Sequence, residues 1–170
     1  MRTKKIKLLS ELLATDIPKS EYSIVNSAWL AMMGLRINGD LDIIISKTLW
    51  RSHFSKYPED KSFGVPGPFE NRIRVHPLFG GVYMRHCNVH DPDELIFEKS
   101  ISVEGIKFIE PQYYFRYKVS RYRMLLEHFR QIPWWRRNNW TSGKHVKTVK
   151  KFTKDSNDLR MLKEFFSKSS

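Results

Sequence analysis

The sequence predicts one α/β (α+β) domain over residues 1–170, in which helices flank a small mixed sheet. The chain has 170 residues, an ordinary length for one domain with its own core. Hydrophobic residues make up 41% of the chain and aromatic residues 14%, which is typical of a folded protein rather than a disordered one. Segments with helical spacing of apolar residues alternate with short apolar segments typical of strands. Both kinds of element are therefore expected in one domain.

The first 34 residues are expected to be mainly helical. Leucines recur at helical spacing between residues 8 and 13, and Pro18 ends that element. Residues 23–33 are mostly apolar and compatible with a helix, and Gly34 is well placed as its C-terminal stop. The basic amino end is too short in its apolar part, and too interrupted by acids, to be a signal peptide. We interpret it as the first helix.

A central strand is predicted next. The pair Asn38-Gly39 is typical of a turn, and residues 40–46 follow it as a strand. The three consecutive isoleucines of this strand, residues 43–45, indicate burial on both faces, as in the middle of a sheet. Ser46 can cap a helix over residues 47–57.

The second half is expected to complete the sheet and add two helices. A proline- and glycine-rich loop is expected over 58–71, followed in "RIRVHPLF" by a strand that Pro77 ends. "LIFEKSISVEGIKFI" (95–109) is typical of two short strands joined by a turn at Glu104-Gly105. A helix is expected from Pro111 to about Arg130, then a basic, Trp-rich loop over 133–146 and a last helix over roughly 154–167.

Charge and composition narrow the classes of partner. The net charge is +12 and the pI is about 9.9, which favours anionic partners such as nucleic acid, nucleotides, phosphorylated sugars or lipid head groups. No apolar run approaches the roughly 20 residues that a membrane span needs. The single cysteine, Cys87, excludes an internal disulfide and fits a cytoplasmic protein.

Two aspartates at the start of the central strand are the first candidate site. In a strand, Asp40 and Asp42 lie two residues apart and share a face. Two carboxylates beside an apolar run repel each other and resist desolvation, unless a cation lies between them. Mg²⁺ (or Mn²⁺), held by carboxylates together with substrate phosphates, would resolve that conflict. The alternative is that both aspartates lie on a solvated strand end after a turn, where Asp is common.

The stretch "IVNSAWLAMMGLRINGDLDIIIS" resembles the core motif of the nucleotidyltransferase (DNA polymerase β-like) superfamily, in the form "GxxRxxxDLD" of small bacterial AbiEii-type and minimal members. In that family a Gly-Ser opens a helix, and the next strand carries Asp-x-Asp. The residues that match here are Ser27, Gly34, Arg36, Asp40 and Asp42.

Two later segments extend the resemblance to about residues 22–165. "SVEGIKFIEPQYYFRYK" is similar to a family segment that ends in a helical lysine, here Lys118, and "KDSNDLRMLKEF" is similar to the family's closing helix, which includes Asp155 and Asp158. The resemblance implies a nucleotidyltransferase fold and transfer of a nucleoside monophosphate from an NTP to an unidentified hydroxyl or phosphate acceptor. It implies Asp40 and Asp42 as catalytic, metal-binding residues, and Ser27, Arg36 and Lys118 as nucleotide- or phosphate-binding residues.

The chain departs from the family at two positions. Asn26 stands where the family usually has Gly, which crowds the approach of a phosphate. The third metal-binding carboxylate normally lies on a neighbouring strand, but the expected strand offers Arg74 and His76, and imidazole suits softer metals than magnesium. Other acids are near enough in the sequence to be considered: Glu70, Glu94, Glu98 and Glu104.

Two further clusters leave other functions open. Residues His86, Cys87, His90 and Asp91 could suggest zinc, but a loop of non-ligating side chains is the simpler interpretation. The tryptophans and cations of residues 133–151 could bind a polyanion, or the tryptophans could pack on the core. The alternatives to an enzyme are therefore a basic nucleic-acid-binding protein and a catalytically degenerate nucleotidyltransferase-fold regulatory subunit.

Overall fold

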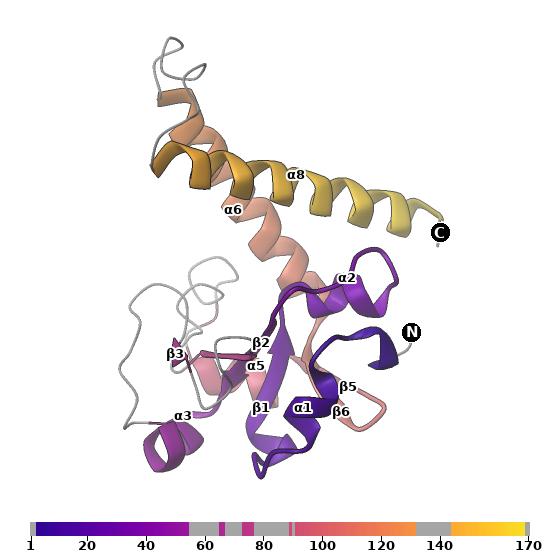
Figure 1. The fold of residues 1–170 in the computed structure, drawn as a ribbon, viewed down its shortest axis with the longest axis vertical. Coiled ribbons are helices and arrows are strands. Elements are labelled where there is room, and N and C mark those ends of the chain that lie inside the picture. Colours follow the sequence, from indigo (N-terminus) through magenta and orange to yellow (C-terminus); the bar gives the residue numbers. More distant parts are fainter. Residues whose placement is uncertain are drawn as a thin grey trace. The chain divides into compact units, whose positions relative to one another are not determined.

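The computed structural model of the chain describes residues 3–54, 65–66, 73–76, 89, 91–131 and 144–168 (Figure 1). It divides into two compact units, residues 1–114 and 115–170. We call them the first and second units and describe each by itself. The prediction of a single domain over the whole chain stays a prediction.

The first unit contains the sheet and the short helices. Its helical elements are η1 (Thr3–Lys5), α1 (Leu9–Leu13), η2 (Lys19–Glu21), α2 (Ala28–Met32), α3 (Lys47–Leu49), η3 (Trp50–Phe54, a π-helix) and α5 (Pro92–Phe97). Its strands are β1 (Tyr22–Val25), β2 (Leu41–Ile45), β3 (Val65–Pro66), β4 (Ile73–His76), β5 (Ser100–Val103) and β6 (Ile106–Ile109).

The described strands form one mixed sheet in the order β3-β4-β2-β1-β6-β5. Strand β1 is antiparallel to β2 and parallel to β6, and β2 is parallel to β4. Every residue of β2 is buried, so the prediction of a central strand from its isoleucine run is confirmed. The predicted α+β class, a mixed sheet with helices around it, is also confirmed.

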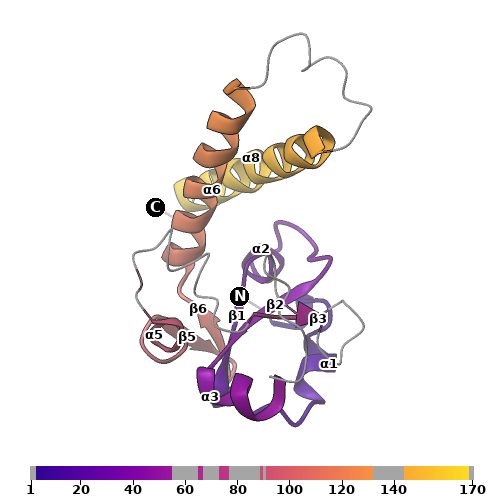
Figure 2. The ribbon, with the colours of Figure 1, turned by 90° about the vertical axis from the view of Figure 1, so that its left-hand side faces the viewer.

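The core of this unit lies where α2 and α5 meet the sheet. Trp29 of α2 is fully buried and its Nε1 donates a hydrogen bond of 2.7 Å to the carbonyl oxygen of Ile109 at the end of β6. The Trp29 ring lies 5.6 Å, centroid to centroid, from the ring of Phe108. Helix α5 lies beside β5 and β6 (Figure 2) and contributes the fully buried Leu95. Burial of these large apolar side chains stabilises the unit by about 1.5–3 kcal/mol each.

The predicted helix over residues 23–33 is wrong in its first part. Residues Tyr22–Val25 form strand β1, and the helix begins only at Ala28. The reason lies in the tertiary structure. Strand β1 pairs with β2 on one side and with β6 on the other, so its backbone hydrogen-bonding groups find partners in both neighbouring strands. The predicted stop at Gly34 is confirmed by its positive φ of 75°, which glycine adopts without a side-chain clash.

Two other local predictions around β2 and the hairpin are confirmed. The side-chain oxygen of Ser46 accepts a hydrogen bond of 3.1 Å from the amide of Leu49 and so caps α3. Strands β5 and β6 form the predicted hairpin. Its two turn residues, Glu104 and Gly105, have φ of 52° and 74°, as a two-residue turn with both central residues left-handed requires.

Residues 95–97 are helical, although the sequence suggested a strand. Asp91 accepts a hydrogen bond of 2.9 Å from the amide of Asp93, and Pro92 occupies the first turn, so this segment begins as a capped helix. Strand β4 agrees with the strand predicted to end at Pro77. Within the predicted loop over 58–71 only Val65 and Pro66 are described, and there the loop prediction is wrong, because both residues pair with β4 as strand β3.

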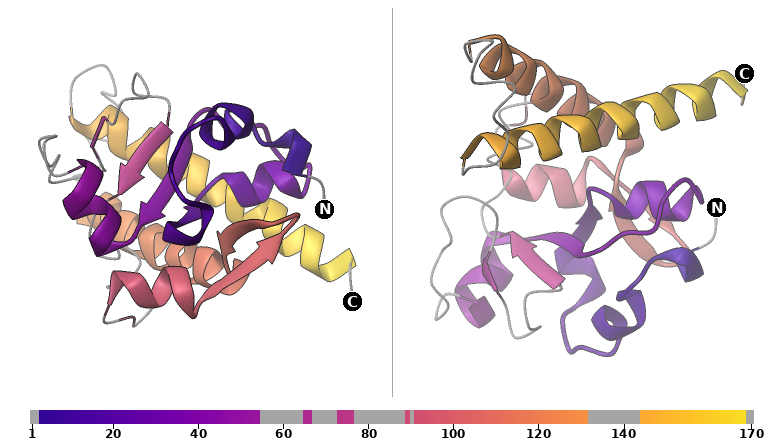
Figure 3. Two further views of the ribbon diagram at one scale, coloured as in Figure 1. Left: turned by 90° about the horizontal axis from the view of Figure 1, so that it is seen from below. Right: turned by 45° about the horizontal axis from the view of Figure 1, so that its top comes forward.

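The second unit consists of two long helices, most of α6 (Pro111–Gln131) and α8 (Lys144–Lys168), which cross (Figure 1; Figure 3, right). Helix α6 has the predicted extent. Helix α8 begins ten residues before the predicted start at 154, because residues 144–153 contain neither proline nor glycine to interrupt it. Across the described part of the chain, none of the helices combines the length and the apolar character needed to cross a membrane.

Candidate functional site

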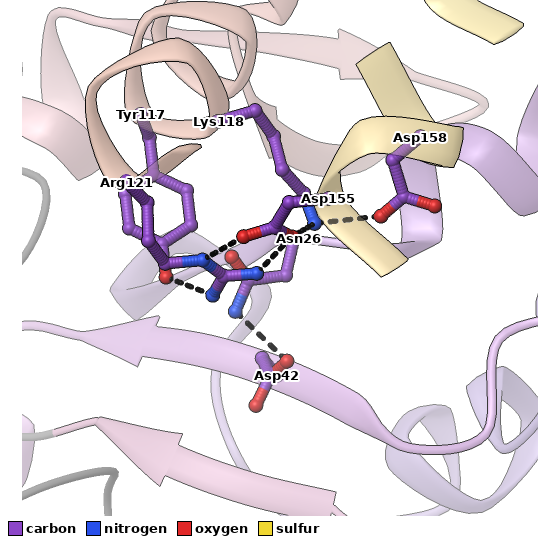
Figure 4. Close-up of polar contacts among 7 residues, drawn as sticks. All are labelled: Asn26, Asp42, Tyr117, Lys118, Arg121, Asp155 and Asp158. Carbon is purple, nitrogen blue, oxygen red and sulfur yellow. Dashed lines mark hydrogen bonds and ion pairs between the residues drawn. The ribbon is translucent and has the colours of Figure 1, made fainter. Parts of the chain in front are cut away.

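Asp42 is the buried carboxylate of the candidate site. It lies in β2 with only 7% of its surface exposed, and its Oδ2 accepts a hydrogen bond of 2.8 Å from the side-chain amide of Asn26 (Figure 4). A buried carboxylate without such a donor is strongly disfavoured, because it loses the hydration of its charge. The Asn26 amide therefore satisfies one oxygen of Asp42 within the buried sheet.

Asn26 also determines how the chain turns from β1 into α2. Its φ is 59°, in the left-handed region that glycine adopts freely and that asparagine tolerates better than most residues. The backbone conformation that favours glycine is thus present at the position where the resembled family has glycine. What differs is the side chain, which reaches across to Asp42 on the neighbouring strand.

Asp40 lies just before β2 and contacts an arginine from the next strand. The Nη1 of Arg74 is 3.3 Å from Oδ2 of Asp40, and 45% and 27% of the two side chains, respectively, are exposed. Arg74 is also the register partner of Asp42 in the parallel β2–β4 pair, so the side chains of Arg74 and Asp42 point to the same face. The expectation that Arg74 occupies the face shared with the aspartates is confirmed.

A buried asparagine holds the turn that presents Asp40. Asn38 is fully buried, and its amide nitrogen donates to the carbonyl oxygens of Lys7 and Asp40, at 3.0 and 2.9 Å. Its side-chain oxygen accepts a 2.8 Å hydrogen bond from the amide of Lys7. The sequence identified Asn38 only as a turn residue. Its role in tying the amino-terminal segment to the site depends on contacts 31 residues apart.

The two predicted phosphate-binding residues of the first unit lie on either side of α2. Ser27 directly precedes α2 and is 6% exposed, and its hydroxyl does not cap the helix. Because α2 has five residues, few aligned peptide dipoles contribute at its start, and the expected helix-dipole attraction for a triphosphate is small. Arg36 follows α2, and its Nε and Nη2 atoms are shielded from solvent.

The predicted metal site has two carboxylates whose positions are described. Among residues 3–54, 65–66, 73–76, 89, 91–131 and 144–168, no three His, Cys, Asp or Glu side chains are grouped as a metal site would need. Glu94 and Glu98 lie 3.8 and 4.0 Å from the ammonium of Lys99, and Glu104 accepts a hydrogen bond from Thr3. Glu70 lies outside the described residues, and the side chain of His76 is not among the described side chains. Carboxylate oxygens are the ligands that Mg²⁺ prefers, so Asp40 and Asp42 fit in kind.

The second unit holds a buried ionic cluster. The ammonium of Lys118, on α6, lies 2.7 Å from Asp155 and 2.6 Å from Asp158, both on α8, and all three side chains are at most 4% exposed (Figure 4). Arg121 donates to the Asp155 carboxylate and to the hydroxyl of Tyr117. Lys118, which was predicted to bind phosphate, thus contacts two aspartates of the segment "KDSNDLRMLKEF".

The charges of this cluster stabilise one another. Burial raises the pKa of Asp155, but the hydrogen bond from Arg121 and the nearby Lys118 charge outweigh it, and the net result is a lowered pKa. Burial likewise lowers the pKa of Arg121, whereas the hydrogen bond to Asp155 reverses that effect and raises it. Both groups are therefore charged at neutral pH, and together they hold α6 against α8.

Of the predicted zinc cluster and the Trp-rich segment, the structure describes mainly Asp91, whose role is structural. Asp91 caps α5, and its carboxylate lies 2.6 Å from the ammonium of Lys47, which lowers the pKa of Asp91 mainly through that hydrogen bond. Its expected neighbours in a zinc cluster, together with the Trp-rich segment, fall outside the described residues: His86, Cys87, His90, Trp134, Trp135 and Trp140.

Comparison of the chain with models of known protein families, with curated proteins and with solved structures gives no match. The resemblance to nucleotidyltransferases therefore rests on the sequence motifs alone.

Proposed function

We propose that this chain is a nucleotidyltransferase-like protein that transfers a nucleoside monophosphate from an NTP to a hydroxyl or phosphate acceptor. The observation that carries the proposal is the left-handed Asn26, which turns β1 into the short α2 and leaves Asp42 on the antiparallel neighbour strand. The order strand, turn, helix and Asp-x-Asp, which resembles the family motif, supports the proposal.

In the proposed reaction an acceptor oxygen forms a bond to the α-phosphorus as the bond to the pyrophosphate oxygen breaks. The acceptor proton leaves to solvent, and pyrophosphate is the second product. Asp40 and Asp42 would hold Mg²⁺ or Mn²⁺, which when bound neutralises phosphate charge and lowers the pKa of the attacking hydroxyl. Arg36 and Ser27 supply a cation and a hydroxyl on either side of α2 for the phosphates.

Arg74 is compatible with this role. Its contact with Asp40 is a partly exposed ion pair, and such pairs contribute about 0–1 kcal/mol. A triphosphate offers the guanidinium a stronger, multiply charged partner. Arg74 can therefore exchange Asp40 for a phosphate when the nucleotide binds, which leaves the carboxylate to the metal.

The test combines binding and transfer. Mg²⁺ with an NTP should raise the melting temperature of the wild type, since a ligand that binds only the native state stabilises it. Asp42→Asn should lose the metal-dependent part of that shift, while the matched control Asp16→Asn, an exposed aspartate, should keep it. When all four NTPs are tried, label from the α-phosphate of at least one of them should then appear on an acceptor in cell extract. If Asp42→Asn and the wild type respond equally to Mg²⁺-NTP, the proposed site is wrong.

A second candidate is a catalytically degenerate member of the same fold. It is favoured by one observation, which is that Arg74 lies in register with Asp42 on the strand where the family's third carboxylate is normally found. In that case Mg²⁺-NTP would bind weakly or not at all, and no label would be transferred by the wild type.

A further inference from the structure

The positive charge of this protein is concentrated in its second unit. Residues 115–170 contain 15 of the 30 Lys and Arg residues but only 4 of the 18 Asp and Glu residues. They therefore carry a net charge of +11, whereas residues 1–114 carry +1. The unit that contains the aspartate pair is almost neutral, so the high pI of the chain belongs to the helical unit.

The acids of the second unit do little to reduce its surface charge. Asp155 and Asp158 are 0% and 1% exposed and are bound to Lys118 and Arg121. The two other acids, Glu127 and Glu164, lie on the surface, each 3.1 Å from an arginine of its own helix. Because the buried acids are matched by buried cations, the surface keeps nearly all of the excess.

The exposed cations lie in one row on α6 and in two groups on α8. On α6, Arg116, Arg123 and Arg130 are exposed and recur every seven residues, which places them along one face over about 21 Å. On α8 the exposed cations among the described side chains form two groups on different sides of the helix, Lys150, Lys151 and Lys154 on one side and Arg160 and Lys163 on another. The helix pair, held together by the buried ionic cluster, therefore presents its exposed cations in fixed positions.

We propose that the exposed basic faces of α6 and α8 bind the sugar-phosphate backbone of a nucleic-acid duplex. A duplex carries one negative charge per roughly 1.7 Å of its axis and is stiff over the length of these helices, so it matches cations fixed on them. An anionic membrane is a poorer match. The exposed large apolar side chains described in this unit are Phe115 and Met124, both on α6, and α8 adds none that would insert into lipid. The inference is independent of nucleotidyl transfer.

The test uses the full chain with a fluorescent 20-base-pair RNA or DNA duplex of mixed sequence, titrated at several salt concentrations. Lys150→Glu/Lys154→Glu, which changes two exposed lysines on one side of α8, should weaken binding at least tenfold. It should also reduce the slope of log affinity against log salt by about two, since each phosphate contact contributes about 0.9. The matched control is Lys7→Glu/Lys19→Glu, which makes the same charge change at exposed lysines of the first unit and should alter affinity less than threefold.

Lys150→Gln/Lys154→Gln removes the charges without reversing them and controls for misfolding. It should show about half of the loss, with an unchanged helical circular dichroism spectrum. Three outcomes overturn the proposal. One is equal weakening by both charge-reversal pairs, which would mean that net charge alone acts. Another is failure of the wild type to bind either duplex. The third is tighter binding to vesicles containing anionic lipid than to duplex, which would assign the surface to a membrane.

Discussion

The side-chain amide of Asn26 donates a hydrogen bond of 2.8 Å to the carboxylate of Asp42, across the antiparallel pair β1–β2. Asn26 therefore has two functions at once, since its left-handed backbone turns the chain into α2 and its side chain occupies an oxygen of the proposed metal ligand. These two functions can be separated by mutation, because glycine retains the first and lacks the second.

Asn26→Gly should keep the fold and strengthen the response to Mg²⁺-NTP. Glycine adopts the positive φ without strain, and the freed Asp42 oxygen becomes available to a cation. Asn26→Ala also removes the amide but places a side chain at a strained φ, so it should destabilise the protein by about 1–2 kcal/mol more than glycine does. Denaturant unfolding with and without Mg²⁺-NTP measures both effects. A smaller ligand-induced shift in Asn26→Gly than in the wild type would contradict the proposed role of Asp42.

Arg74→Asp should convert this strand position into the third carboxylate that the resembled family places there. The new side chain would share a face with Asp42, so three carboxylates would repel one another without a metal. We expect a lower melting temperature in a chelator and a larger rise on adding Mg²⁺ or Mn²⁺ than the wild type shows. Arg74→Ala separates the loss of the cation from the gain of an acid. Identical metal responses of the two variants would show that the side chain at position 74 does not reach a metal held by Asp40 and Asp42.

Asp155→Asn should destabilise the second unit strongly. It leaves Lys118 and Arg121 with one buried carboxylate instead of two, and removing one partner of a buried ionic contact costs about 3–5 kcal/mol. Glu164→Gln, which removes an exposed acid of the same helix, is the matched control and should cost about 0–1 kcal/mol. Equal losses in the two variants would mean that the cluster is not buried in solution.

The stabilisation that Asp155 contributes should depend on pH, and the pKa of Asp155 fixes the direction of that dependence. The folded pKa of Asp155 lies below its ordinary value of 3.8, so the unfolded chain takes up the proton first as the pH falls. The stabilisation from Asp155 is therefore complete above about pH 4 and is lost as the pH falls further towards the folded pKa. The difference in unfolding free energy between wild type and Asp155→Asn should shrink below pH 4 in chemical denaturation. A constant difference from pH 7 down to pH 2 would contradict the lowered pKa.

The sequence alone determined the elements that depend on local chemistry. The isoleucine run made β2 a central strand, Ser46 capped α3, and Glu104-Gly105 turned the β5–β6 hairpin, because caps, turns and apolar runs act over a few residues. It also singled out Asp40, Asp42 and the neighbouring Arg74 as the chemically unusual part of the sheet.

Only the tertiary structure shows which segments pair with Tyr22–Val25 and which side chains contact Lys118. Tyr22–Val25 became a strand because two neighbouring strands pair with it, against its local helical pattern. Lys118, an expected phosphate ligand, lies between two aspartates 37 and 40 residues away, because the crossing of α6 and α8 buries all three charges together. Strand pairing and the burial of charge act between segments far apart in the chain. The spacing of residues along the sequence therefore could not predict strand β1 or the contacts of Lys118.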